Sequence, residues 1–254
     1  MMKRKRILAL FLAAVSCLSL AVSASAANTV NRKATDFKDY DGTAWYAEAV
    51  SAAVDNGLLY GKSSTILDPN GDMTRAEMAA IINRSFGCYK TADISQYKDV
   101  SKSKWYYKDV ALAVQMGTYN GRSNSAMAPD APITRQEAMT VVARALELDY
   151  DSYSKTDLSA FSDRSEISNW ALPYVRAMVG ADYIHGRGKT LAPLDNITRA
   201  EFAQIFYNII GTYIVSKGTY DKDIKGSVLI RTNEVMLKDM TVDGDLIIGC
   251  GAAD

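Results

Sequence analysis

Apolar residues recur at helical spacing in six segments of this chain. Intervals of three and four residues place side chains on one face of an α-helix, so the pattern predicts six amphipathic helices. Three of these segments follow a tryptophan and three follow a threonine. The predicted buried faces are Val50, Ala53, Val54; Met78, Ile81, Ile82; Val110, Ala113, Val114; Met139, Val142, Leu146; Val175, Met178, Val179; and Phe202, Ile205, Phe206, Ile209.

The ends of these segments carry helix-capping residues. A threonine followed three residues later by a glutamate forms a capping box, and this pair opens the second helix of each set. The pairs are Thr74 and Glu77, Thr134 and Glu137, and Thr198 and Glu201. Gly57 and Gly117 occupy the expected left-handed C-cap of the first helix, where the third set has Asp182.

The six helices form three copies of one helix-loop-helix unit. The distance from tryptophan to threonine is 29 residues for Trp45 to Thr74 and for Trp105 to Thr134, and 28 for Trp170 to Thr198. We assign the units to residues 36–90, 91–150 and 155–213. A two-helix unit of this size cannot bury both of its apolar faces alone, so we expect the three units to pack together.

An arginine follows each capping threonine, in the sequences MTRAE, ITRQE and ITRAE. The first turn of a helix disfavours a cation and offers unpaired amides to an anion. A guanidinium there is a two-pronged donor suited to a carboxylate. Arg75, Arg135 and Arg199 therefore indicate local anion sites, and each loop adds a cation after a glycine: Gly61 and Lys62, Gly121 and Arg122, and Gly186 and Arg187.

This pattern resembles the S-layer homology repeat in three tandem copies, over roughly residues 36–210. The resemblance is carried by the aromatic-x-Asp start, the tryptophan, the glycine-containing loop and the TRAE helix opening. It implies a mainly α fold in which the repeats pack as a pseudo-threefold helical module. It also implies grooves that bind anionic, pyruvylated secondary cell-wall polysaccharide linked to peptidoglycan. The expected binding residues are the three arginines, the three loop cations, the three loop glycines, and Trp45, Trp105 and Trp170.

The same residues also have structural interpretations. Each arginine could pair with an acidic neighbour such as Asp39, Asp99 or Asp163. The tryptophans could lie in the core instead of offering a flat face to a sugar. The loop cations could be solvated surface charges.

The first 26 residues have the form of a secretory signal peptide. Four basic residues precede an apolar run, and Ala24-Ser25-Ala26 provides a cleavage site. Lipidation of Cys17 is the alternative. Cleavage leaves 25 basic residues against 29 acidic ones, which argues against binding nucleic acid or an anionic membrane by bulk charge. Cys88 and Cys250 then remain, with no metal or disulfide pattern. We expect a secreted protein of the cell wall or surface layer, with no membrane span.

Residues 214–254 form a short β-rich segment. Runs at 227–230, 234–237 and 245–248 predict strands of a sandwich or the first coil of a β-solenoid. We interpret the segment as the truncated start of a cargo domain. The sequence predicts no catalytic residue, metal site or cofactor. The leading hypothesis is a noncovalent wall anchor, and the alternatives are an anchored polysaccharide- or peptidoglycan-acting enzyme or a self-assembling surface-layer subunit.

Overall fold

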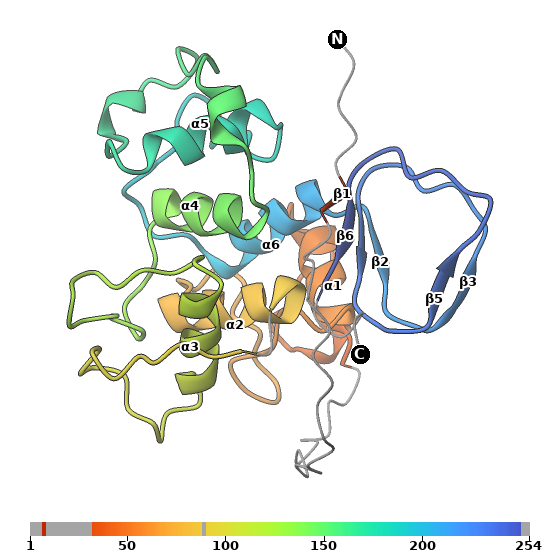
Figure 1. Ribbon diagram of the computed structural model, residues 1–254, viewed down its shortest axis with the longest axis horizontal. Helices are drawn as coiled ribbons and strands as arrows, with labels where there is room; N and C mark the ends of the chain where they lie inside the picture. The colour runs from red at the N-terminus through yellow and green to blue at the C-terminus, as the bar shows by residue number, and fades with distance from the viewer. Residues whose placement is uncertain (1–6, 9–31, 88–89, 250–254) are drawn as a thin grey trace.

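The computed structural model describes residues 7–8, 32–87 and 90–249, and the chain there is mainly α-helical with a β-rich end (Figure 1). Most of the predicted leader, with Cys17, lies outside the described residues, as do Cys88 and Cys250. The elements in chain order are β1 (Ile7–Leu8), η1 (Ala34–Asp36), α1 (Ala47–Asp55), α2 (Arg75–Phe86), α3 (Tyr107–Gln115), α4 (Arg135–Ala145), η2 (Tyr150–Tyr153), η3 (Arg164–Glu166), α5 (Leu172–Gly180), α6 (Arg199–Ile209), β2 (Thr212–Ile214), β3 (Gly218–Tyr220), β4 (Val228–Ile230), β5 (Val235–Leu237) and β6 (Leu246–Ile248).

The predicted helix ends are confirmed. In α2 the Thr74 hydroxyl accepts a hydrogen bond from the Glu77 amide at 3.2 Å, and the Glu77 carboxylate accepts one from the Thr74 amide at 3.0 Å. The same capping box opens α4 and α6. Gly57, Gly117 and Asp182 follow α1, α3 and α5 with φ of 67°, 71° and 67°.

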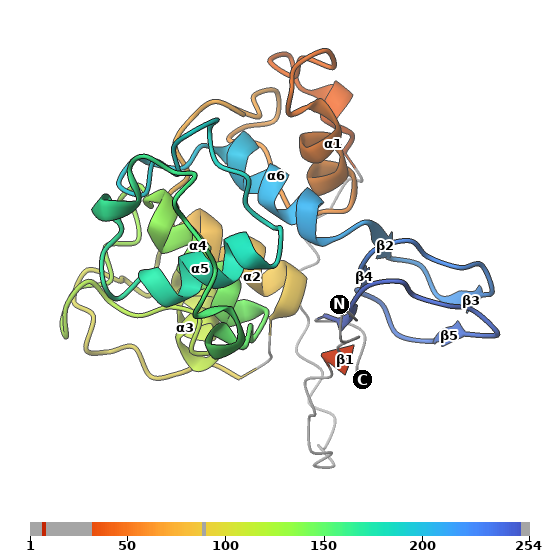
Figure 2. The same ribbon diagram turned by 90° about the horizontal axis from the view of Figure 1, so that it is seen from above.

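Each helix pairs mainly with a helix of a neighbouring unit. Helix α3 packs on α2, α5 packs on α4, and α1 packs on α6, as Figures 1 and 2 show. The first helix of one unit therefore covers the second helix of the unit before it, and the first unit covers the third. This exchange buries apolar faces that a single two-helix unit would expose.

Backbone hydrogen bonds connect the three units in a closed ring. The amide of Met73 donates to the carbonyl of Ile197, that of Ile197 to Ile133, and that of Ile133 to Met73, each at 3.0 Å. All three side chains are fully buried. The residues just before α2, α4 and α6 thus meet at the centre of the module.

The aspartate of the aromatic-x-Asp start stabilises the loop of its own unit. The carboxylate of Asp39 accepts hydrogen bonds from the amides of Leu67 and Asp68 at 2.8 and 2.7 Å. Asp68 has a φ of 58°, a left-handed conformation that side chains other than glycine disfavour. Asp99 and Asp163 hold Ala128 and Ala192 in the same way. The carboxylates of these aspartates therefore bind backbone amides of the loop.

The β-rich end is a parallel coil docked on the helices. Strand β2 pairs with β4 and β4 with β6, while β3 pairs with β5, all in parallel. Equivalent strands lie 16 and 18 residues apart, from Thr212 to Val228 to Leu246. The solenoid alternative is therefore correct, because a sandwich is built from antiparallel strands. β1 also pairs with β6 in parallel.

Side chains on both faces of this coil are buried. Ile214, Val228 and Ile230 form its own small core, whereas Leu229 and Ile247 join the main core of the helical module. Arg231 donates from Nε to the carbonyl of Arg84 at 2.8 Å and from Nη1 to the carbonyl of Asn56. The coil is thus joined to the ends of α1 and α2. No helix in the described part of the chain is long and apolar enough to cross a membrane.

Candidate binding pockets

Three surface pockets bring all twelve predicted binding residues together, four in each. Their volumes are about 360, 390 and 420 Å³. Each pocket takes its loop glycine, loop cation and capping glutamate from one unit. The buried arginine comes from the preceding unit in the ring, and the tryptophan comes from the following one. We name the pockets by their tryptophans: the Trp105 pocket, the Trp170 pocket and the Trp45 pocket.

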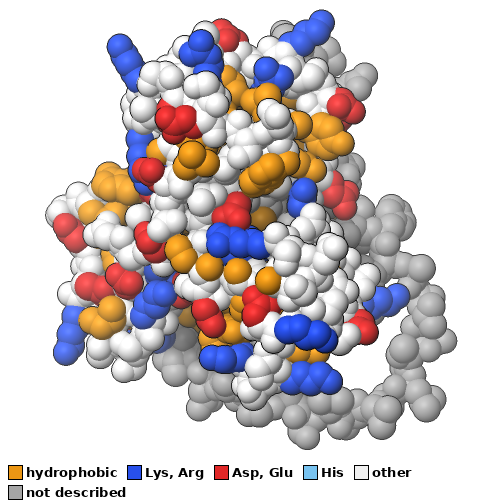
Figure 3. Space-filling model, turned by 90° about the vertical axis from the view of Figure 1, so that its left-hand side faces the viewer, with side chains coloured by type: hydrophobic (Ala, Val, Ile, Leu, Met, Phe, Trp, Pro, Cys, Tyr) orange, Lys and Arg blue, Asp and Glu red, His pale blue; other side chains and the backbone are white. Residues whose placement is uncertain are grey.

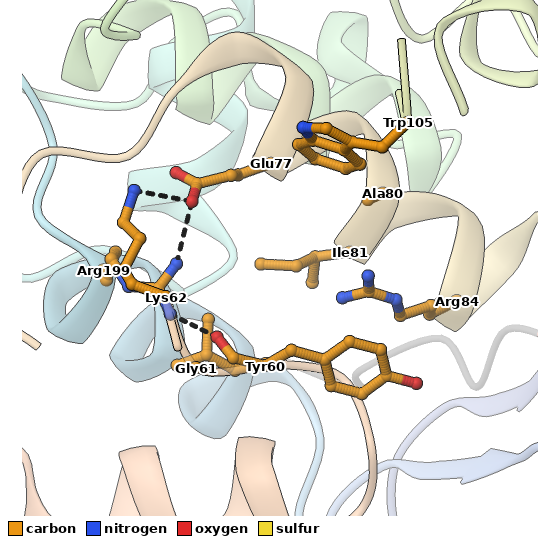
Figure 4. A pocket seen from close by; sticks show the side chains of 10 residues that line it. Tyr60, Gly61, Lys62, Glu77, Ala80, Ile81, Arg84, Trp105 and Arg199 are labelled. Carbon is orange, nitrogen blue, oxygen red and sulfur yellow. Dashed lines mark hydrogen bonds and ion pairs between the residues drawn. The ribbon is translucent and has the colours of Figure 1, made fainter. Parts of the chain in front are cut away.

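The Trp105 pocket shows the arrangement most plainly (Figure 4). Glu77 forms ion pairs with Lys62 at 2.6 Å and with Arg199 at 3.3 Å. Arg199 also donates to the carbonyl of Tyr60. Trp105 stands on the opposite side of the opening from the Gly61 loop, with Ile81 between them. The pocket thus combines an aromatic face, an apolar floor and a cluster of fixed charges.

The other two pockets repeat these contacts. In the Trp170 pocket Glu137 pairs with Arg75 at 3.1 Å and with Arg122 at 3.4 Å. In the Trp45 pocket Glu201 pairs with Arg135 at 3.1 Å and with Arg187 at 2.6 Å. Three glutamates thus link the three units through arginines from their neighbours. Each arginine therefore does pair with an acidic residue, as the structural interpretation expects, but its partner is a glutamate of a neighbouring unit and not Asp39, Asp99 or Asp163.

The arginines of the TRAE and TRQE openings are buried at the backs of the pockets. Arg75, Arg135 and Arg199 are 5%, 5% and 2% exposed. Each Nε donates to a backbone carbonyl, of Met127, Leu191 and Leu67, at 3.0, 2.8 and 2.9 Å. Their guanidinium groups therefore bridge a loop and a glutamate within the protein, besides lining the pockets.

Two of the glutamates, Glu77 and Glu201, have a lowered pKa. Burial by itself raises the pKa of Glu77, but the hydrogen bond from Lys62 and the amide of Thr74 outweigh it, so the pKa lies below its ordinary value. In Glu201 burial also acts upward, and hydrogen bonds from Arg187 and the amide of Thr198 bring the pKa down. Burial lowers the pKa of Arg135 and of Arg199, against the upward pull of their glutamates.

The tryptophans and glycines have distinct positions. Trp45, Trp105 and Trp170 are 64%, 60% and 52% exposed, which excludes the alternative that they are core residues. A Cβ on Gly61 would lie 2.3 Å from the Phe37 ring, and one on Gly121 would lie 2.5 Å from Tyr97. The loop glycines therefore allow the loop to pack on the aromatic residue that starts each unit.

One further position of the repeat lines all three pockets and was not predicted. Arg84 and Arg144 lie ten residues after the capping threonines, and Asn208 occupies this position in the third unit. The guanidinium carbon of Arg84 lies 3.8 Å from the centre of the Tyr60 ring, and that of Arg144 lies 4.9 Å from the centre of the Tyr174 ring. Their equal distance from the threonines is the sequence signal that could have identified them.

Charges of both signs are spread over the side of the molecule seen in Figure 3, with apolar side chains between them. On this face, charge of one sign is therefore not concentrated as recognition by bulk charge would require. Among the described residues, no group of three or more His, Cys, Asp or Glu side chains is arranged to hold a metal ion.

A family model described as the S-layer homology domain matches residues 36–79, 96–139 and 160–203, more than half of the chain. The chain belongs to the S-layer homology family. The three matches begin and end within the three units that form the pockets.

Relatives of known name share this region. The chain is 33% identical over 204 residues to the surface-layer 125 kDa protein of Lysinibacillus sphaericus, covering 79% of this chain and 17% of that protein. It is 28% identical over 200 residues to an amylopullulanase of Thermoanaerobacterium thermosulfurigenes, covering 73% and 11%. It is 29% identical over 150 residues to the cellulosome-anchoring protein of Acetivibrio thermocellus, covering 57% and 33%. The chain thus spans a minor part of each relative.

Family membership fixes the general role and location of the module. S-layer homology domains are binding modules that anchor proteins to the cell wall through its polymers. Together with the similarity to surface-layer proteins, membership indicates that this S-layer homology protein is exported to the cell surface.

Proposed function

We propose that this S-layer homology protein attaches an exported polypeptide to the cell wall by binding anionic secondary polysaccharide in its inter-unit pockets. Pyruvylated sugars are the ligand class that we assign, because a pyruvyl group carries a carboxylate on an otherwise apolar-faced ring. The observation that carries the proposal is the convergence of an exposed tryptophan, a loop cation and a buried arginine in one pocket.

Each residue type has its own part in this proposal. The tryptophan packs against the C–H face of a sugar ring. Lys62 and Arg122 stand at the openings of their pockets, where they can donate to a ligand carboxylate. The buried arginines contribute positive charge from the back of the pocket and hold its walls together. The glycines keep the loop close to the unit's aromatic residue and so set the width of the pocket.

The proposed module is an approximately threefold arrangement of units at 36–90, 91–150 and 155–213. The closed ring of hydrogen bonds and the repeated ion pairs support it. Several pockets on one rigid body can engage one polymer at once, and linked weak contacts raise avidity through effective concentration. Noncovalent attachment to a repeating polymer is therefore compatible with modest affinity at each pocket.

Retention on purified cell walls tests the proposal. The chain without its predicted leader, residues 27–254, is incubated with sacculi that carry or lack secondary polymer. We expect retention only on the polymer-bearing sacculi, and loss of retention when Trp45, Trp105 and Trp170 are all changed to alanine. Equal retention on stripped sacculi would refute the proposal.

A matched control uses exposed apolar side chains that do not line the pockets. Leu194, Val215 and Met236 are 54%, 48% and 59% exposed. Their triple alanine variant removes similar apolar surface and is expected to bind as the parent does. Loss of retention in this control as well would mean that the assay reports general surface stickiness.

The role of the whole protein is a separate proposal. The β-coil begins at Thr212 with β2, and we interpret residues 214–254 as the start of the anchored cargo. The names of the relatives suggest two alternatives, a polysaccharide-acting enzyme and a structural subunit of a surface layer. Assembly of the purified protein into sheets would favour the subunit, and hydrolysis of a wall or storage polysaccharide would favour the enzyme.

A further inference from the structure

The three pockets differ in charge, although they share one architecture. The Trp105 pocket contains three cations, Lys62, Arg84 and Arg199, against one carboxylate, Glu77. The Trp170 pocket likewise contains Arg75, Arg122 and Arg144 against Glu137. Each of these two pockets therefore carries a surplus of two positive charges.

The Trp45 pocket lacks this surplus for two local reasons. Asn208 stands where the other pockets have Arg84 or Arg144, so one cation is absent. Asp195 stands where the other units have Gly71 and Ala131, three residues before the capping threonine. Its carboxylate accepts an ion pair from Arg187 at 2.8 Å, and Glu201 binds the same guanidinium at 2.6 and 2.9 Å. Among the lining residues Arg135 and Arg187 therefore face Glu201 alone, and Asp195, beside the pocket, neutralises the remaining positive charge.

Side-chain amides replace the missing cation. Gln204, which takes the place of Ala80 and Thr140, donates from its side-chain amide to Asn208 at 2.8 Å, and Asn208 donates to the carbonyl of Tyr183 at 3.1 Å. His185 lines the same pocket. Side-chain amides offer donors and acceptors together, which suits hydroxyl and acetamido groups better than a carboxylate.

We propose that the Trp45 pocket binds an uncharged sugar of the wall polymer, whereas the Trp105 and Trp170 pockets bind acidic sugars. The inference rests on the proposed function and assigns a different ligand class to one of the three sites. An acidic ring entering the Trp45 pocket meets Arg187 already paired with two carboxylates, so it gains little net charge attraction there. A neutral sugar ring does not depend on charge attraction, and it can pack on the exposed indole and hydrogen-bond to the amides.

The tryptophans provide a separate reporter for each pocket. The chain has three tryptophans, and each lines one pocket. Labelling residues 27–254 with 5-fluorotryptophan gives three ¹⁹F resonances, which single Trp→Tyr variants assign. The probes are the secondary polymer released from sacculi of the producing bacterium and the same polymer after its carboxylates have been reduced to alcohols.

We expect all three resonances to respond to the native polymer. After carboxyl reduction, the responses of Trp105 and Trp170 should weaken about tenfold or more in apparent affinity, as expected when hydrogen bonds to a charged group are lost. The response of Trp45 should persist, with little dependence on salt. If Trp45 loses its response together with the others, or responds to neither polymer, the inference is overturned. If no tryptophan responds to the native polymer, the proposed function itself fails.

A pair of exchanges supplies the matched variants. N208R combined with D195A gives the Trp45 pocket the charges of the Trp170 pocket, and should make its response dependent on carboxylates and salt. R144N should make the Trp170 resonance respond more weakly to the native polymer and leave that of Trp105 unchanged. If the Trp45 resonance of the N208R/D195A variant still responds equally to the native and the carboxyl-reduced polymer, the charge difference does not determine the ligand.

Discussion

At the scale of single residues, the arginine in each helix opening is a buried junction between units. Arg135 illustrates this, because its Nε donates to the Leu191 carbonyl while its Nη1 pairs with Glu201, and both partners belong to the third unit. A cation in the first helical turn opposes the helix dipole by about 0.3–1 kcal/mol. Two charge-assisted contacts to a neighbouring unit are sufficient to offset that cost.

Removal of this junction should therefore destabilise the protein. We expect R135A to lower the free energy of unfolding by about 3 kcal/mol, because the variant leaves a buried carbonyl and a partly buried carboxylate without their shared donor. Chemical denaturation measures the difference. K104A, at an exposed position, is the control and should change stability by less than about 0.5 kcal/mol. An R135A protein of parental stability that no longer binds the polymer would instead assign the arginine to direct ligand contact.

At the scale of helices, local sequence determines where each element begins and ends. The capping boxes, the glycine C-caps and the apolar stripes were all predictable, because each depends on residues within one or two turns. The partners of the helices were not. The Arg75–Glu137 pair joins residues 62 positions apart, and Arg199 and Glu77 are 122 apart. A repeat pattern alone does not say that each unit covers its neighbour.

One C-cap departs from the repeat and gives a test. Asp182 holds a φ of 67° at the position where Gly57 and Gly117 stand, and a left-handed conformation costs a non-glycine residue about 1 kcal/mol. Its contact with His185 is exposed and long, at 3.6 Å, so little is lost on its removal. We expect D182G to raise the free energy of unfolding by about 0.5–1 kcal/mol. The reciprocal change G117D should lower it, and a stabilising G117D would show that the backbone argument is wrong.

At the scale of the whole molecule, the helical module and the β-coil share one core. The predicted strands at 227–230, 234–237 and 245–248 correspond to β4, β5 and β6, whereas β2 and β3 were missed. These two strands are three residues long and carry few buried apolar side chains, so no alternation marks them. Their parallel pairing depends on strands that are a full coil apart in the sequence. Short-range patterns contain no information on such pairing.

The attachment of the coil depends on Arg231 as well as on apolar packing. This side chain bridges the carbonyls of Asn56 and Arg84, at the ends of two helices. We expect R231A to lower the free energy of unfolding by about 1–3 kcal/mol, since it leaves these carbonyls without their charged donor. Amide hydrogen exchange should then accelerate in β4 and β6 more than in α4, while K238A serves as a surface control. Equal acceleration throughout the chain would mean that the coil and the helices unfold together.

The position of bound carbohydrate is the sharpest test of binding in the inter-unit pockets. We propose a crystal structure of residues 27–254 with an acidic fragment of the secondary wall polymer. We expect a sugar ring on the indole of Trp105 or Trp170, with its carboxylate beside Lys62 or Arg122. Carbohydrate bound elsewhere on the surface, with these pockets unchanged, would contradict it.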